Sequence, residues 1–327
     1  MITEFLSSDS WINPQINYLL YLQDLRIQSG GIFDNMFLSL TRLGEIFFTT
    51  LLVCVIYWCI DFKAGLYIFF VNSISLLFSQ FLKLVACIYR PWILSDKIHP
   101  CAKAIPHAGN YSFPSGHTMV ATSIWGSLAF IFRKKWWISC LLVLVILIVA
   151  FSRNYLGVHT PQDVIIGFVT GLIFIFASDK IINWCEKDIN RYLYVLGCIN
   201  VFAIITLIYI LTKTYPMDYV DGKLLVDPVR AIRITIMYYG WSLGIANGII
   251  ICRRFFPFNP KNGTIYAKIV RGLIGLITAC GLFTIIEKFV YTNSFNNLIS
   301  AVIMFVIAFY LTAIYPLIFS KLLKKYM

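Results

Sequence analysis

Charged side chains are scarce in this chain of 327 residues: they make up 13% of it, whereas 59% of the residues are hydrophobic and 17% are aromatic. A soluble domain carries about 25% charged residues, so the composition excludes an ordinary soluble protein. Acidic residues are the scarcest, at 15 against 27 basic ones, and the formal net charge is +12. In so apolar a chain this excess indicates basic loops on the cytoplasmic side of a membrane. We therefore expect membrane lipids as surroundings and no nucleic-acid partner.

Paired-cysteine patterns are also missing. The nine cysteines form no CxxC pair and no Cys/His spacing typical of a metal site, so we expect no bound metal and no other cofactor. Most of them lie in apolar runs, where cysteine packs as a small hydrophobic residue. The first fifteen residues are polar and acidic, without a cationic start or a small-residue cleavage site. The sequence thus predicts no cleavable signal peptide.

Long apolar runs dominate the rest of the chain. A helix needs about 20 apolar residues to cross a bilayer. Segments of roughly this kind lie at 43–60, 65–89, 116–132, 137–152, 164–182, 193–213, 231–252, 265–290 and 297–320. The predicted fold class is therefore all-α, a polytopic membrane helix bundle with about nine transmembrane helices. Residues 14–29 are amphipathic and too charged to span, which favours an interfacial helix.

Loop charges predict the orientation. Most loop lysines and arginines fall on one side of the predicted bundle, in loops 61–64, 133–136, 179–192 and 253–264 and in the tail 321–327. Basic loops favour the cytoplasm, so we expect a multi-pass cell-membrane protein with a cytoplasmic C-terminus. The opposite, extracytoplasmic side then holds the N-terminus and the loops 90–115, 153–163, 214–230 and 291–297.

Three polar clusters share that extracytoplasmic side. The first is KLVACIYRP, with Lys83 and Arg90 seven residues apart, a spacing that predicts one shared helix face. The second is PSGH at 114–117, at the entry of the next apolar run. The third is SRNYLGVHTPQD at 152–163. Apolar packing alone does not explain polar residues gathered in this way.

The cations of these clusters predict a pocket for an anion. A charged side chain at membrane depth is costly unless it is paired or wetted, so Lys83, Arg90 and Arg153 are functional candidates. Arginine suits oxyanions because its guanidinium offers a fork of donors. Ser115 is a suitable N-cap, and Gly116 lets a ligand approach the backbone. Free N–H groups at a helix N-terminus bind phosphate readily.

The histidines supply candidates for the reaction. Asp163 lies one helical turn after His159, so its carboxylate can hold one ring nitrogen and leave the other free to attack. His117, from another cluster, can protonate a leaving oxygen. A nucleophile, an orienting acid, a general acid and a cationic cradle together predict phosphoryl transfer without a metal.

These residues form the signature K-x6-RP, PSGH and SR-x5-H-x3-D, and every position matches. In this the chain resembles the type 2 phosphatidic acid phosphatase (PAP2) superfamily, membrane-bound branch. The resemblance implies a phosphohistidine on His159, supported by Asp163, with His117 protonating the leaving group and no metal required. It implies that the phosphoryl oxygens are held by Lys83, Arg90, Ser115, Gly116 and Arg153.

The resemblance also implies a division of the chain. We expect an N-terminal extracytoplasmic interfacial helix within 1–42, a PAP2-like catalytic membrane core over 43–190 and additional transmembrane helices over 191–327. The active site is then extracytoplasmic.

The expected substrate is a lipid phosphate or an isoprenyl diphosphate, of the phosphatidic acid, phosphatidylglycerophosphate or undecaprenyl diphosphate class. Two alternatives stay open. The nine-helix layout is also similar to the glucose-6-phosphatase branch, which implies a sugar phosphate. The extra C-terminal helices also fit a transporter that binds anionic lipid without chemistry. Transfer to an acceptor other than water is a further possibility, and the sequence does not indicate an oligomeric state.

Overall fold

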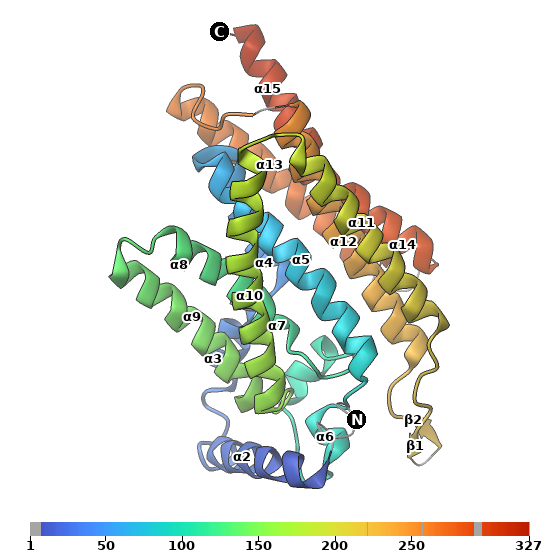
Figure 1. Ribbon diagram of the computed structural model, residues 1–327. Helices are drawn as coiled ribbons and strands as arrows, with labels where there is room; N and C mark the ends of the chain where they lie inside the picture. The colour runs from blue at the N-terminus through green and yellow to red at the C-terminus, as the bar shows by residue number, and fades with distance from the viewer. Residues whose placement is uncertain (1–7, 221, 257, 291–295, 327) are drawn as a thin grey trace. The chain divides into compact units, whose positions relative to one another are not determined.

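The computed structural model describes residues 8–220, 222–256, 258–290 and 296–326 (Figure 1). These residues are mostly helical, as the apolar runs predict. The two strands among them are β1 (Tyr219–Val220) and β2 (Lys223–Leu224), which pair antiparallel as one short hairpin. The all-α fold class is therefore confirmed.

The helical elements follow one another along the chain with short connections. The first are α2 (Asp9–Gln28), α3 (Asp34–Leu40), η1 (Thr41–Gly44), α4 (Ile46–Val55), η2 (Ile56–Ile60), α5 (Phe62–Ala86), α6 (Pro91–Leu94), η3 (Ala102–His107), α7 (Gly116–Ala121), η4 (Thr122–Gly126) and α8 (Ser127–Ile131). The later ones are α9 (Trp136–Tyr155), α10 (Pro161–Glu186), α11 (Arg191–Thr212), α12 (Pro228–Phe255), α13 (Ile265–Ile285), η5 (Ile286–Val290), α14 (Asn297–Phe309), η6 (Tyr310–Ile314) and α15 (Tyr315–Tyr326).

Within the described ranges, seven helices are long and apolar enough to cross a membrane. The count rises to eight if the pair Asp34–Gly44 and Ile46–Ile60, bent by 51°, is one span. The polytopic membrane bundle is thus confirmed, although the sequence predicted about nine spans. One predicted span, 116–132, is instead the three short pieces α7, η4 and α8, and another, 43–60, is part of the bent pair.

The chain divides into two compact units. The first comprises Met1–Glu45, Phe78–Leu172 and Ile208–Thr235, and it contains all three polar clusters. The second comprises Ile46–Leu77, Ile173–Leu207 and Ile236–Met327.

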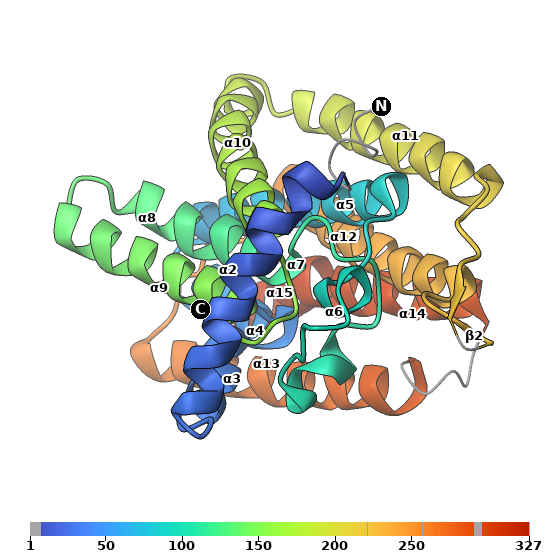
Figure 2. The same cartoon turned by 90° about the horizontal axis from the view of Figure 1, so that it is seen from below.

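In the first unit, α2 lies across the end of the helices where α10 begins (Figures 1 and 2). Its apolar face buries Ile12, Ile16 and Leu19 against Ile98. Two glutamines fix it to the start of α10: the backbone N–H of Gln162 donates to Oε1 of Gln15 at 2.9 Å. This partner satisfies one of the N–H groups that a helix start leaves without an intrahelical acceptor.

Glycines let α10 approach α7 closely in the same unit. A Cβ at Gly167 would lie 2.8 Å from the carbonyl oxygen of Ser115, and one at Gly171 would lie 2.7 Å from Cβ of Thr122. Neither position has room for a side chain, so the backbone of the PSGH segment rests directly on α10.

The second unit uses the same device. Three glycines of α12 stand four residues apart, and a Cβ on any of them would collide with α14 or η6. Spaced small residues of this kind let membrane helices pack at short range. The colliding positions are Gly240, Gly244 and Gly248. Trp58 donates from its indole nitrogen to the carbonyl oxygen of Leu311 at 2.9 Å, which ties η2 to η6.

One expectation about the first cluster is wrong. Lys83 and Arg90 do not share a helix face, because α5 ends at Ala86 and Arg90 precedes α6 with extended dihedrals. Cys87 has a φ of 49°, a left-handed conformation that stops the helix. Nζ of Lys213 donates to the last carbonyls of α5, at 2.6 Å and 2.8 Å, and so caps the broken end.

Candidate active site

A tight turn after α9 brings His159 back toward Arg153. The N–H of Val158 donates to the carbonyl of Arg153 at 3.1 Å, and the N–H of Gly157 donates to that of Asn154 at 2.9 Å. These two bonds form a Schellman motif, in which the residue after the C-cap adopts a left-handed conformation. That residue is Gly157, with a φ of 72°. The short SR-x5-H spacing is therefore the length of one helix-ending turn.

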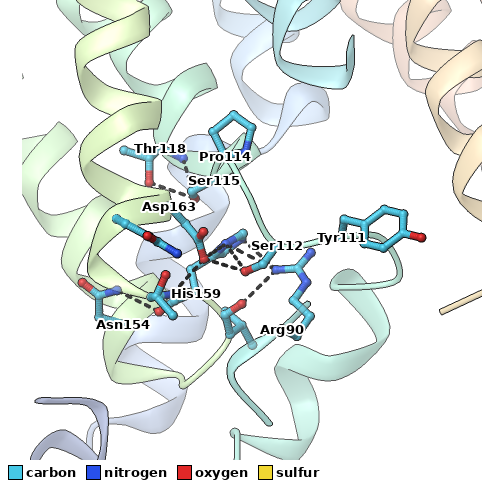
Figure 3. Close-up of polar contacts among 12 residues, drawn as sticks. Arg90, Tyr111, Ser112, Pro114, Ser115, Thr118, Asn154, His159 and Asp163 are labelled. Atoms are coloured by element: carbon cyan, nitrogen blue, oxygen red, sulfur yellow. Dashed lines mark hydrogen bonds and ion pairs between the residues drawn. The ribbon is translucent and has the colours of Figure 1, made fainter. Parts of the chain in front are cut away.

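Asp163 organises one side of the His159 ring (Figure 3). Its Oδ2 lies 3.3 Å from Nδ1 of His159 and accepts from the N–H of Thr160 at 2.8 Å. Ser112 also donates to Oδ2, at 2.5 Å, and its hydroxyl lies 3.3 Å from Nδ1. A carboxylate at this place favours the tautomer with the proton on Nδ1. The lone pair then sits on Nε2.

Arg90 occupies the other side of the ring. Its Nη1 lies 2.8 Å from Nε2 of His159 and donates to the carbonyl of Val158 at 2.8 Å. Its Nε donates to the carbonyl of Asn110 at 2.8 Å. A guanidinium only donates, so its approach to Nε2 also fits a lone pair on that nitrogen.

The environment of His159 favours its neutral form. The residue is 2% exposed. Burial, and then the nearby positive charges of Arg90, Arg153 and Lys83, lower the pKa of His159 well below its ordinary value. Its imidazole is therefore neutral at neutral pH, which is the form a nucleophile requires.

Lys83 donates hydrogen bonds to the backbone around the PSGH segment. Its Nζ donates to the carbonyls of Tyr111, Ser112 and Pro114, at 3.1 Å, 3.1 Å and 2.6 Å. An ammonium group has three donors, so these three contacts use all of them. Lys83 thus holds the loop before α7 in place, and a direct contact with phosphate requires that it release a carbonyl.

The PSGH segment starts α7 beside Asp163. The hydroxyl of Ser115 is the N-cap and accepts from the N–H of Thr118 at 3.4 Å, while its own N–H donates to the carbonyl of Asp163 at 2.9 Å. A Cβ at Gly116 would meet nothing within 4 Å, so open space adjoins the backbone there. Nε2 of His117 lies 3.9 Å from Oε1 of Glu45.

Arg153 enters the same region from α9. It is 2% exposed, and its Nη1 donates to the hydroxyl of Thr41 at 2.9 Å. The first unit therefore brings all eight predicted site residues together around the loop before α7 and the turn after α9.

Several buried polar atoms of this site have no hydrogen-bond partner within the described part of the chain. Buried polar atoms are nearly always paired, so such a group points to a polar ligand. The atoms are Nδ2 of Asn110, Nε2 of His117, Nε of Arg153, Oγ1 of Thr160 and Oδ1 of Asp163. Two of them, on Asn110 and Arg153, can only donate, which suits an anion.

Sequence reasoning missed four residues that the structure adds to the site: Thr41, Glu45, Asn110 and Ser112. None of them belongs to a recurring spacing, and all four lie outside the three clusters. As for metals, no group of three or more His, Cys, Asp or Glu residues that could hold an ion occurs among the described residues.

Two family models match the chain. The model described as PAP2 superfamily matches residues 64–187, and the one described as PAP2 superfamily phosphatase, transmembrane extension, matches residues 236–325. The first match contains all eight predicted site residues. The second covers α13, α14 and η6, and most of α12 and α15.

Curated relatives match part of the chain. Phosphatidylglycerophosphatase B of Bacillus subtilis is 28% identical over 118 residues, which is 34% of this chain and 55% of the relative. Undecaprenyl-diphosphatase of Sulfolobus acidocaldarius is 29% identical over 119 residues, 36% of this chain and 55% of the relative. Undecaprenyl-diphosphatase BcrC of Bacillus subtilis is 35% identical over 98 residues, 29% of this chain and 49% of the relative. The chain thus spans about half the length of these relatives. No solved structure matches it significantly.

Proposed function

We propose that this chain, which belongs to the PAP2 superfamily, is a membrane phosphatase that hydrolyses a lipid phosphate or an isoprenyl diphosphate. The observation that carries the proposal is the His159 ring, held between Asp163 and Arg90 and surrounded by buried donors that have no partner in the described chain. The named relatives act on phosphatidylglycerophosphate and undecaprenyl diphosphate, which makes these two the first substrates to test.

In the proposed reaction Nε2 of His159 attacks the phosphorus atom. An N–P bond forms, the P–O bond to the leaving group breaks, and His117 gives its proton to the leaving oxygen. Asp163 stabilises the positive charge that develops on the ring. Water then attacks the phosphohistidine, with His117 taking its proton, and phosphate leaves.

The remaining site residues hold the phosphoryl oxygens in this proposal. Arg90 and Arg153 supply charged donors, and the open backbone at Gly116 gives the oxygens room to approach. Ser115 shapes the helix start, and Lys83 holds the loop that carries Ser112. No step requires a metal.

We further propose that the site faces the extracytoplasmic side of the cell membrane, with the C-terminus in the cytoplasm. The uneven distribution of basic loop residues supports this orientation. In the same scheme residues 43–190 form the catalytic core, and residues 191–327 add helices to it. The end of the first family match at residue 187 supports a boundary in this region.

The test is phosphate release by the purified protein in detergent with a chelator present. The substrates are phosphatidic acid, phosphatidylglycerophosphate, undecaprenyl diphosphate and glucose-6-phosphate, and His159→Ala is the control. Turnover of a lipid that the variant loses supports the proposal. Turnover of the sugar phosphate alone overturns the lipid assignment. A folded protein inert toward all four, whose lipid binding survives His159→Ala, is a transporter or binding protein instead.

A further inference from the structure

We infer that Glu45 is the charge partner of His117 and keeps this histidine able to act as the general acid. The inference deepens the proposed function and rests on it. Glu45 lies outside all three sequence motifs and ahead of the first family match, which begins at residue 64. It acts through His117, so it is a positioning residue.

The segment Thr41–Glu45, which we call the TRLGE turn, is seated on the catalytic helices by contacts independent of Glu45. Thr41 accepts from Arg153, as described above. The carbonyl of Leu43 accepts from the indole nitrogen of Trp125 at 2.8 Å. A Cβ at Gly44 would lie only 2.6 Å from the carbonyl oxygen of His117. The turn therefore rests against the backbone of His117 itself.

Glu45 follows η1 directly and has extended dihedrals, φ −89° and ψ 143°. Its Oε1 lies 3.9 Å from Nε2 of His117, and the side chain is 32% exposed. At this distance the two groups attract each other without a hydrogen bond. Nε2 of His117 thus remains able to donate to a leaving oxygen.

The charges around His117 explain why it needs a carboxylate. Three elements bring titratable groups toward it: Arg153 on α9, Arg90 before α6 and Glu45 after η1, with the neutral His159 nearby. Burial, and then the positive charges of Arg153 and Arg90, lower the pKa of His117 to about 4, and Glu45 is the neighbour that opposes this shift. A general acid has to carry its proton before the bond breaks.

The proton balance of the step follows from this arrangement. The N–P bond on His159 forms while the P–O bond breaks, and the proton on Nε2 of His117 moves to the leaving oxygen, which departs as a neutral alcohol from a monoester or as an isoprenyl monophosphate from a diphosphate. His117 becomes neutral, next to Glu45. In the second step it takes a proton from the attacking water, and Glu45 stabilises the imidazolium that results.

The test compares two leaving groups. A short-chain phosphatidic acid expels an alcohol that needs a proton, whereas p-nitrophenyl phosphate expels a phenolate that does not. We expect Glu45→Gln to lower kcat for the phosphatidic acid by about 10- to 100-fold, within the range that general acid catalysis contributes. The rate with p-nitrophenyl phosphate should change by less than about threefold. The alkaline limb of the phosphatidic acid profile should move to lower pH.

The controls keep the outcome decisive. Asp24→Asn removes an exposed carboxylate from α2 in the same unit and should change neither rate. If Glu45→Gln does not fold, Glu45→Asp is the second variant, because it keeps the charge but moves it away from His117. It should lower kcat for the phosphatidic acid more than the rate with p-nitrophenyl phosphate, by a smaller factor than Glu45→Gln. Equal losses with both substrates, or an unchanged rate with phosphatidic acid, overturn the inference. A wild-type protein inactive on both substrates overturns the proposed function first.

Discussion

Nη1 of Arg90 lies 2.8 Å from Nε2 of His159, the nitrogen that the proposed reaction uses as its nucleophile. The guanidinium therefore covers the lone pair that must reach phosphorus. A phosphoryl group can approach Nε2 only if Arg90 exchanges this contact for contacts with the phosphoryl oxygens. Arg90 also donates to the carbonyls of Asn110 and Val158, and these contacts anchor its guanidinium beside the ring.

Arg90→Lys should lower kcat/KM by about 100-fold or more, since an ammonium group cannot reproduce a fork that bridges two carbonyls and a ligand. Lysine preserves the charge, so a loss of this size reports on geometry. Steady-state kinetics with the lipid substrate that the phosphate-release assay identifies measures this loss. The matched control is Arg133→Lys, at an exposed arginine beyond α8, and it should leave kcat/KM unchanged. An Arg90→Lys enzyme of wild-type efficiency contradicts the proposed bridging role.

Asp163→Asn should leave the protein folded and reduce kcat by about 1,000-fold or more, as expected when a histidine loses the carboxylate that sets its tautomer. The amide can still contact Ser112 and the N–H of Thr160 through its oxygen, but it does not stabilise a positive ring. Single-turnover kinetics separates this chemical step from binding. Asp188→Asn, an exposed carboxylate between α10 and α11, serves as the comparison. A loss confined to KM would show that Asp163 acts in binding.

The pH dependence of kcat/KM should carry an acid limb well below pH 6.5. The pKa of His159 is lowered, so its ring remains neutral as the pH falls and activity is lost only when the pH passes through that lowered pKa. If the acid limb originates in the substrate, its pH shifts with the pKa of the substrate's phosphate group. Profiles measured with two phosphate esters of different acidity therefore distinguish a substrate limb from an enzyme limb. An enzyme limb at or above pH 6.5 would contradict the electrostatics described for His159.

Gly167→Ala should destabilise the protein and impair catalysis together. The new Cβ would stand 2.8 Å from the carbonyl of Ser115, so α10 and the PSGH segment have to move apart. Overpacking of this kind costs typically about 1–3 kcal/mol. Gly197→Ala makes the same chemical change within α11, where a Cβ meets nothing within 4 Å, and should be neutral or stabilising. Thermal unfolding in detergent measures the stability of the two variants, and the turnover rate measures their catalysis. Equal behaviour of the two variants would contradict the close contact between α10 and the PSGH segment.

The parts of the site that the sequence predicts well are the parts with local causes. Thr160, Asp163 and His159 contact one another because they lie within one helix start, and such contacts follow from sequence spacing. Helix existence follows equally directly from the long apolar runs. These features need no knowledge of how distant segments meet.

The features that the sequence does not predict depend on distant segments. The contact between Ser112 and Asp163 spans 51 residues, and that between Thr41 and Arg153 spans 112. Neither a lone serine nor a lone threonine carries a spacing signal. The break after α5 depends on a left-handed conformation at Cys87, which a residue with a Cβ adopts rarely and without a sequence pattern. An uninterrupted helix was therefore the natural, and wrong, expectation between Lys83 and Arg90.

The turn at Gly157 makes the number of residues between Arg153 and His159 important for the site. Its two hydrogen bonds tie the backbone at Arg153 and Asn154 to the residues just before His159. One residue more or fewer between Arg153 and His159 would break this closure and rotate the imidazole away from both Asp163 and Arg90. A single-residue insertion or deletion is therefore expected to impair the site wherever it falls between Arg153 and His159. The segment thus sets the position of His159 through its length. Glycine is required at position 157 because the backbone is left-handed there and Cα of Pro100 would lie 3.1 Å from a Cβ.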